Sequence, residues 1–446
     1  MKNRILLFAV YYMVFGLFFL SCRSIEPAPV EIVEDVETIS EDVQDQIEPI
    51  REIDIDTSTL PSGTKPLETY TMTNELTDFS FDLFRNLNQQ HPQQNLSFSP
   101  VSLNMALAVI YSGAMADTRE EISGLTGFAQ DADEFHNNWF HYFSSFAQLE
   151  TDTLVDFNLA NRVFVEQTYP VLDAYKDNVE TYHGGAFEQT DFIGDALQAE
   201  ERINAWAAEN TRDRIRNLIP RGTLDHLTRL VLANAIYIKS DWRHPFEEEN
   251  NIQKEFHDIS GQPRTIEFMS QRQNRIPYLE LEDRKVIQLP YTSPHLSLMI
   301  ILPDETNVRD ISSYIPDAEK YSQMVDNFIL QEVYMEIPKF KIESQFSLSG
   351  QLKQMGMEKA FDTRANFSGI GGQRDLFISA ILQKVFFEID EKGSEAAAAT
   401  AIIVTTTALI PDIEEPKEFI ADRPFIFILK ENQFNTPLFV GQFVSP

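Results

Sequence analysis

The chain has 446 residues and a mass of 51.2 kDa, enough for one large domain or for two or three small ones. Its 69 acidic and 36 basic residues give a formal net charge of −33, which excludes nucleic-acid binding through a basic surface and disfavours docking on polyanions such as heparin. The single cysteine, Cys22, excludes intrachain disulfides and clusters of thiolate metal ligands.

The first 22 residues have the pattern of a secretory leader. Lys2 and Arg4 precede an almost wholly apolar run, Ile5 to Leu20, and Ser21 and Cys22 follow. A small residue before cysteine resembles a bacterial lipoprotein signal. The sequence therefore predicts a signal peptide over 1–21 and a lipid on Cys22 that anchors the protein to a membrane outside the cytoplasm, at the cell surface or in the periplasm. The alternatives are an ordinary signal peptide and a transmembrane anchor, for which the apolar run is marginally short.

Residues 22–69 are acidic and interrupted by prolines, and their few aliphatic side chains are isolated. Such a composition cannot bury enough apolar surface to fold, and its like charges repel one another. We therefore expect a disordered tether between the membrane and a folded domain at 70–446. A weak partner-binding helix is the alternative interpretation of this segment.

The folded part begins with helical periodicity and continues mainly with strands. Apolar residues recur at helical spacing between Leu76 and Leu87, and helices are also predicted over 101–111 and 203–219. Later segments are continuous apolar runs or alternate with period two: 230–238, 296–302, 333–337, 425–429 and 438–444. This order predicts one α+β domain.

Signatures of catalysis are absent from the sequence. There is no GxSxG, HExxH, GxGxxG or GxxxxGK[ST] motif, and the histidines are scattered. His136 and His141 are five residues apart, which does not place two ligands on one face of a helix. We expect neither an enzyme nor a bound cofactor or metal.

The segment from Glu391 to Ile410 carries no charge after Glu395. In an extended strand one of its faces is small or β-branched throughout: Ser394, Ala396, Ala398, Thr400, Ile402, Val404 and Thr406. Glu395 lies on the other face, so a one-residue slip would bury its carboxylate. The alternative is a short alanine-rich helix, which the β-branched run after Ala401 disfavours.

Several segments, in the expected order, resemble the serpin family over about 70–446. They are 95–122 (NLSFSPVSLNMALAVIYSGAMADTREEI), 230–246 (LVLANAIYIKSDWRHPF), 337–361 (IPKFKIESQFSLSGQLKQMGMEKAF) and 419–446 (FIADRPFIFILKENQFNTPLFVGQFVSP). The resemblance implies an α+β serpin fold. This fold has a large, mainly antiparallel central sheet, additional sheets, helices concentrated in the N-terminal half and an exposed reactive-centre loop.

The resemblance also implies a mechanism. A serine or cysteine protease attacks the loop and forms an acyl-enzyme, and the cut loop then enters the central sheet as a new strand and carries the protease with it. The residues that match the family's hinge are Glu391, Gly393, Ser394, Glu395, Ala396, Ala397, Ala398, Ala399 and Thr400.

The reactive bond is expected at Thr407–Ala408, within a window from Thr405 to Ile410, because the return to Arg423 is longer than in many relatives. No Lys or Arg occurs between Lys392 and Lys417, which excludes a trypsin-like target. Elastase-like, subtilisin-like or papain-like enzymes with small or aliphatic pockets are expected instead.

Further positions match family features individually. Ser99, Ser102, Asn234 and Gln383 match the shutter, where the strands of the sheet part, although the family usually has a histidine at the position of Gln383. Trp242 and Glu391 match the breach at the top of the sheet. Ordinary core roles remain alternatives for Asn234 and Trp242.

The sequence thus predicts a monomeric, membrane-tethered bacterial serpin whose partner is a protease. Two alternatives remain: a non-inhibitory or substrate-like serpin, and a surface lipoprotein that binds a ligand such as a glycan.

Overall fold

The computed structural model describes residues 69–446 except 145, 184–185, 306–307 and 395–414. The predicted signal peptide, Cys22, the tether as far as residue 68 and the reactive bond lie outside the described residues, whereas Thr69 already begins the first helix. The boundaries 1–21, 22–69 and 70–446 therefore stay predictions. Within the described part of the chain, no helix is both long and apolar enough to cross a membrane.

Most helices precede the main run of strands, as expected. They are α1 (Thr69–Gln90), α2 (Pro100–Tyr111), α3 (Ala116–Thr126), α4 (Ala132–Ser144), α5 (Ala147–Thr151), α6 (Asp173–Tyr182), α7 (Phe192–Asn210), α8 (Ala318–Asp326), α9 (Ser349–Gln354) and α10 (Ser368–Gly371). Helix α2 is buried along its whole length, and the Ser99 side chain caps its first turn.

One sheet has six strands in the order β10-β11-β4-β2-β3, with β12 paired to β4. Its members are β2 (Val155–Glu166), β3 (Ala186–Thr190), β4 (Leu230–Asp241), β10 (Phe340–Ser347), β11 (Ala380–Ile389) and β12 (Gly393–Ser394). Strands β11 and β4 run parallel, as do β2 and β3, and the other pairs are antiparallel.

The second sheet has nine strands in the order β1-β15-β14-β8-β7-β6-β9-β13, with β5 paired to β6. Its members are β1 (Leu96–Phe98), β5 (Ile252–His257), β6 (Pro263–Glu280), β7 (Arg284–Pro290), β8 (Leu296–Pro303), β9 (Ile329–Pro338), β13 (Lys417–Ile420), β14 (Phe425–Glu431) and β15 (Pro437–Phe443).

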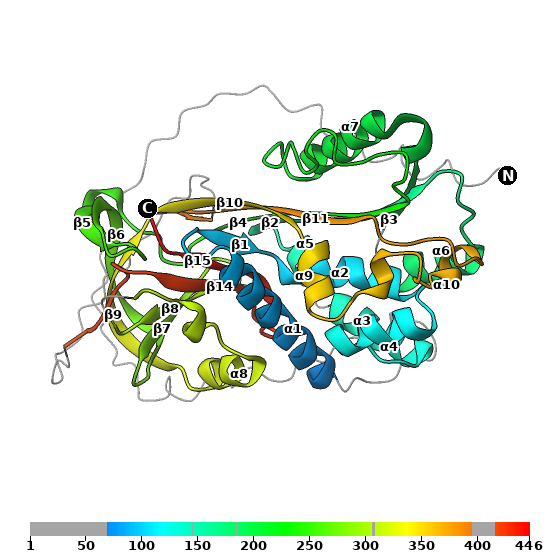
Figure 1. Ribbon diagram of the computed structural model, residues 1–446. Helices are drawn as coiled ribbons and strands as arrows, with labels where there is room; N and C mark the ends of the chain where they lie inside the picture. Colours follow the sequence, from blue (N-terminus) through cyan, green and yellow to red (C-terminus); the bar gives the residue numbers. More distant parts are fainter. Residues whose placement is uncertain (1–68, 145, 184–185, 306–307, 395–414) are drawn as a thin grey trace, which may run out of the picture. The chain divides into compact units, whose positions relative to one another are not determined.

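The six-stranded sheet separates two hydrophobic layers, which explains the continuous apolar run of β4. Leu232, Ile236 and Ile238 face the main core that the sheet shares with the helices and the other sheet. Val231, Ala233 and Ala235 alternate with them and belong to a smaller cluster under α7. Helix α7 lies across this outer face of the sheet (Figure 1).

The α+β architecture and the strands predicted from apolar runs are present, but the helix predicted over 203–219 was wrong in extent. Helix α7 ends at Asn210, and Arg212 and Asp213 adopt φ values of 48° and 64°. Left-handed residues cannot continue an α-helix. Ile215, Leu218 and Ile219 are nevertheless buried, because the segment after the turn packs on the same sheet. The apolar spacing therefore predicted correctly which residues are buried, but it did not predict where the helix ends.

Candidate functional site

A tight turn after β11 sends the chain back into the six-stranded sheet. The backbone N–H of Asp390 donates to the carbonyl of Gly393 at 2.9 Å, and the Asp390 carboxylate accepts from the N–H groups of Lys392 and Gly393. Strand β12 then pairs antiparallel with β4, with Gly393 opposite Asp241 and Ser394 opposite Ser240. Gly393 and Ser394, near the start of the Glu391–Ile410 segment, are therefore already part of the six-stranded sheet.

Strands β4 and β11 pair with each other only at the ends that lie away from β12. The parallel pairing of β11 with β4 extends from Ala380 opposite Val231 to Val385 opposite Ile236. Beyond that point β11 continues to Ile389 and β4 to Asp241 without pairing to each other. In the described part of the chain, only the two residues of β12 pair with β4 on this side. The described residues thus leave β4 and β11 unjoined at the end where β12 enters the sheet.

Gly393 lies at the closest approach of this segment to β4. Its φ of 153° is unfavourable for a residue with a side chain, and a Cβ there would overlap the backbone of Ser240 and Asp241. Only glycine allows the chain to turn into the opening at this position.

Ser394 is 3% exposed, and its hydroxyl lies 2.5 Å from the hydroxyl of Tyr291. The Tyr291 ring stacks on Trp242 with centroids 4.4 Å apart, and the Trp242 indole N–H donates to the carbonyl of Asp390 at 2.9 Å. Burial raises the pKa of Tyr291, so the phenol stays protonated and able to donate. Trp242 and Tyr291 thus hold the turn and the start of β12 together.

Glu391 fixes the turn from the other side. Its carboxylate accepts from the Asn251 amide and pairs with the Lys339 ammonium at 2.9 Å, and its carbonyl accepts from the N–H of Phe246 at 2.8 Å. Burial favours the neutral acid, but the hydrogen bonds from Asn251 and Lys339 outweigh it and hold the pKa of Glu391 below its ordinary value. Glu391 is therefore a carboxylate at neutral pH and anchors the turn electrostatically.

Polar side chains also meet beneath the joined ends of β4 and β11. The Gln383 amide is fully buried and pairs with the backbone of Ser99, accepting from its N–H at 3.0 Å and donating to its carbonyl at 2.8 Å. The Ser102 hydroxyl donates to the Asn161 side chain at 2.6 Å. Gln383, unlike a histidine, carries no group that titrates near neutral pH.

Asn234 on β4 lies directly opposite Asn161 on β2 and Gln383 on β11. Its side chain is fully buried, and neither amide atom has a hydrogen-bond partner among the described residues. A buried amide without hydrogen-bond partners is costly, and among the described residues the Asn234 side chain is buried and unsatisfied.

The structure therefore brings the sequence-predicted residues into two groups on β4 and β11. Trp242, Glu391, Gly393 and Ser394 surround the entrance, and Ser99, Ser102, Asn234 and Gln383 surround the joined ends. Glu395, Ala396, Ala397, Ala398, Ala399, Thr400, Thr407 and Ala408 lie outside the described residues. Sequence reasoning missed Tyr291, Lys339, Asn251 and Asn161, because each comes from a distant strand or loop and belongs to no local pattern.

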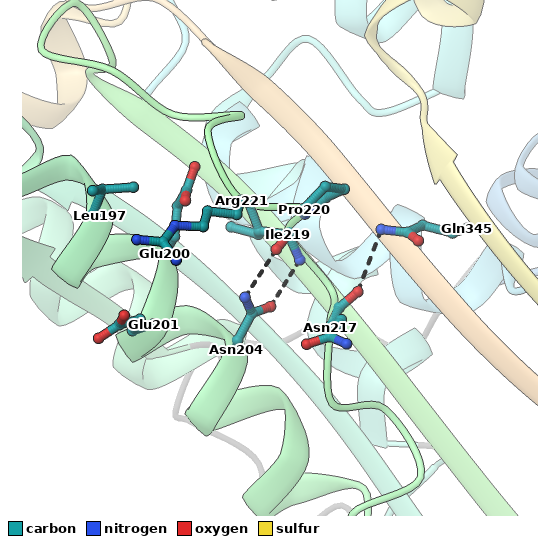
Figure 2. A pocket seen from close by; sticks show the side chains of 9 residues that line it. All are labelled: Leu197, Glu200, Glu201, Asn204, Asn217, Ile219, Pro220, Arg221 and Gln345. Carbon is teal, nitrogen blue, oxygen red and sulfur yellow. Dashed lines mark hydrogen bonds between the residues drawn. The ribbon is translucent and has the colours of Figure 1, made fainter.

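A separate cavity of about 450 Å³ lies between α7, the segment after it and Gln345 on β10 (Figure 2). The Asn204 amide pairs with the backbone of Ile219, accepting its N–H at 2.8 Å and donating to its carbonyl at 2.9 Å. The cavity contains no nucleophile with an adjacent base. No group of three or more His, Cys, Asp or Glu side chains in the described ranges is arranged to hold a metal ion.

Comparisons with known proteins agree with this geometry. The family model described as "Serpin (serine protease inhibitor)" matches residues 74–446. The leukocyte elastase inhibitor of Xenopus laevis is 33% identical over 84% of this chain and 99% of its own length, and that of Sus scrofa is 34% identical over 83% and 98%.

Solved structures of serpins superpose on the chain as well. Serpin48 of the insect Tenebrio molitor covers 86% of this chain and all of its own, with 30% identity and a TM-score of 0.76. The thermophilic serpin tengpin, in its native state, covers 86% of this chain and 97% of its own, with 25% identity and a TM-score of 0.75. The chain therefore belongs to the serpin (serine protease inhibitor) family, and the two relatives above are named as inhibitors, not as enzymes.

Proposed function

We propose that the protein is a suicide-substrate inhibitor that traps serine proteases, and also cysteine proteases, as an acyl-enzyme. Insertion of the cut reactive loop into the six-stranded sheet holds the enzyme in this state. The observation that carries the proposal is the opening between β4 and β11, which Gly393 and Ser394 already enter. Insertion of the cut loop there would form backbone hydrogen bonds with both flanking strands.

The register of β12 determines which residue of β4 would lie opposite each further residue of the inserted loop. Because Gly393 lies opposite Asp241 and Ser394 opposite Ser240, continued antiparallel pairing brings Ala396 opposite Ile238 and Ala398 opposite Ile236. Directly opposite residues share a face of the sheet. Ile236 and Ile238 face the main core, so the small, uncharged face of the loop would be the buried one. Glu395 would lie on the opposite face, beside Lys239.

The same register brings Thr400 opposite Asn234. Asn234 is the buried amide that has no partner in the described part of the chain, and a threonine hydroxyl supplies both a donor and an acceptor. Insertion as far as Thr400 would then give the Asn234 amide a hydrogen-bond partner that the described residues do not supply. This arrangement favours the inserted state and supports a native state that is held kinetically.

Proteases with small or aliphatic specificity pockets are the proposed targets. The loop from Gly393 to Lys417 offers Thr, Ala, Ile, Val and Leu around the expected bond Thr407–Ala408 and has no Lys or Arg inside it. The leukocyte elastase inhibitors at 33–34% identity support an elastase-like target by their names. Subtilisin-like and aliphatic-preferring papain-like enzymes fit the same residues.

Incubation with elastase followed by a denaturing gel tests the proposal. A trap gives a covalent band near the summed masses of inhibitor and enzyme, because the acyl bond survives denaturation. Complete conversion to the cleaved chain without that band would contradict the proposal and favour a substrate-like serpin. An uncut chain with no band would also contradict it for this class of enzyme.

We also propose that the protein is a bacterial-type lipoprotein held at a membrane outside the cytoplasm by a lipid on Cys22. The leader pattern of residues 1–22 is the support for this part. In cells given a labelled fatty acid, we expect the label on the wild-type protein and its loss in Cys22→Ser, with the variant released into the soluble fraction. Equal labelling of both proteins would contradict lipidation at Cys22.

A further inference from the structure

The chain buries two adjacent ionisable side chains where β14 turns into β15, and it does not pair them with each other. Lys430 and Glu431 are the last two residues of β14 and are 2% and 1% exposed. Successive residues of a strand point to opposite faces, so the ammonium and the carboxyl group are directed away from each other. Among the residues that the structure describes, neither side chain forms a salt bridge.

Glu431 is held by neutral groups of the turn. Its carboxyl group accepts from the backbone N–H groups of Gln433 and Phe434, the second at 2.9 Å. The side-chain oxygen of Gln433 is buried and has no hydrogen-bond partner in the described ranges. An amide oxygen only accepts, so it needs a donor, which a protonated carboxyl group supplies and a carboxylate does not. The hydroxyl of Thr436, which also lacks a partner there, can bond to either form.

Lys430 is held by amide oxygens on the other face of the strand. Its ammonium donates to the side-chain oxygens of Asn432 at 3.0 Å and of Asn435 at 2.7 Å. The backbone N–H of Asn432 donates in turn to the carbonyl of His295 at 2.9 Å, which ties the turn to the start of β8. Burial lowers the pKa of Lys430 to about 8, so its charge changes little below pH 7.

Two helices pack against the turn with neutral side chains. The phenol of Tyr321 on α8 donates to the carbonyl of Asn435 at 2.8 Å. Tyr142 on α4 and Tyr321 both lie close enough to Glu431 for its charge to raise their pKa, which burial has already raised. Both phenols therefore stay neutral near pH 7 and give Glu431 no counter-charge. Lys430 is the cation that acts on Glu431 within the described part of the chain.

This environment makes Glu431 titrate in an unusual range. Burial raises its pKa to about 7, and the N–H groups of Phe434 and Gln433 and the charge of Lys430 oppose this only in part. An unperturbed glutamate has a pKa of 4.5, so Glu431 weakens folding progressively as the pH rises from 4.5 to about 7.

A buried histidine pair has the opposite effect on stability. Nε2 of His183 and Nδ1 of His136 lie 3.2 Å apart. Burial lowers the pKa of both side chains, so they destabilise the native state as the pH falls below 6.5. A test of Glu431 must therefore compare proteins that share these histidines.

We infer that Glu431 makes the turn between β14 and β15 a proton-controlled joint of the native state. With a proton on Glu431 the turn packs firmly between α4 and α8. When the proton leaves near neutral pH, a charge without a counter-charge remains buried and loosens this contact. The inference depends neither on the reactive loop nor on protease trapping.

Thermal unfolding of the full chain, wild type against Glu431→Gln, tests the inference at pH 5.5 and pH 8.0 with one heating rate. Glutamine keeps a side-chain oxygen and carries no charge, so it stands for the protonated acid at every pH. All other titrating groups are common to the two proteins and cancel in the difference. Glu249→Gln is the matched control, because Glu249 is exposed and the change in net charge is the same.

We expect Glu431→Gln to unfold about 4 °C above wild type at pH 8.0, and the gain to fall below half of that at pH 5.5. The gain falls because the cost of the buried carboxyl group grows as the pH rises. Glu249→Gln should unfold with wild type at both pH values. No gain at pH 8.0, or an equal gain at both pH values, would overturn the inference.

A second measurement needs only the wild type and so does not depend on folding of the variant. With 13C-labelled glutamate carboxyl groups, we expect one NMR signal of the native protein to titrate with a midpoint near pH 7. The absence of any glutamate midpoint above about pH 6 would overturn the inference, because every carboxyl group would then titrate in the ordinary range.

Discussion

At the scale of single residues, the proposed insertion depends on which face of the loop becomes buried. Ser394 shows this directly, because it is the last described residue before the loop and is nearly inaccessible, with its hydroxyl against Tyr291. Every second residue after it inherits the same face if β12 extends. Ala398 would then lie against Ile236 in the main core.

We expect Ala398→Arg to convert the inhibitor into a substrate. Burial of an unpaired guanidinium costs several kcal/mol, which is enough to lower the partition into trapped complex at least about tenfold. The measurement is the ratio of covalent complex to cleaved chain after reaction with elastase on a denaturing gel. Glu395→Arg is the control, since it adds the same side chain on the face expected to remain in solvent and should still trap. Undiminished trapping by Ala398→Arg would refute the register.

The residue scale also shows how far sequence reasoning extends. The small, uncharged face counted from Ser394 predicted that this residue could be buried, and the structure buries it. No local pattern indicated that Lys339 and Asn251 hold Glu391, or that Tyr291 receives Ser394. These partners are brought together by strand pairing between distant segments. Sequence spacing carries no information on such contacts unless the pairing is already known.

At the scale of elements, the opening is a consequence of parallel pairing that stops early. Strands β4 and β11 both continue past Ile236 and Val385, but each does so without the other. The turn at Asp390–Gly393 directs the following chain into the space between them. A strand inserted there would gain neighbours on both edges, which is the most favourable position in a sheet.

The elements themselves were partly predictable. The runs that became β4 and β8 are apolar without a break because both of their faces are covered, and this signal is local. The end of α7 was not predictable from spacing, because Ile215, Leu218 and Ile219 keep the apolar period after Arg212 and Asp213 have ended the helix. The order of strands and the opening depend on long-range pairing.

At the scale of the whole molecule, the proposed mechanism requires a fold that becomes more stable when the cut loop adds a strand to the six-stranded sheet. The segment between Ser394 and Lys417 is attached at its two ends, to β4 through β12 and to β9 through β13. In the proposed mechanism, cleavage between these ends releases one of them, and the difference in free energy between the uncut and the inserted state drives the movement and distortion of the attached protease.

The most direct test is thermal unfolding of the protein before and after the loop is cut by a protease that escapes trapping and is then removed. A strand of roughly ten residues adds on the order of ten ladder hydrogen bonds at about 1 kcal/mol each. A chain of roughly 370 residues unfolds with an entropy near 0.8 kcal/mol/K, so the unfolding temperature should rise by about 10 °C or more after cleavage. An unfolding temperature that stays the same or falls after the cut would show that the loop does not enter the sheet, and would contradict the proposed mechanism.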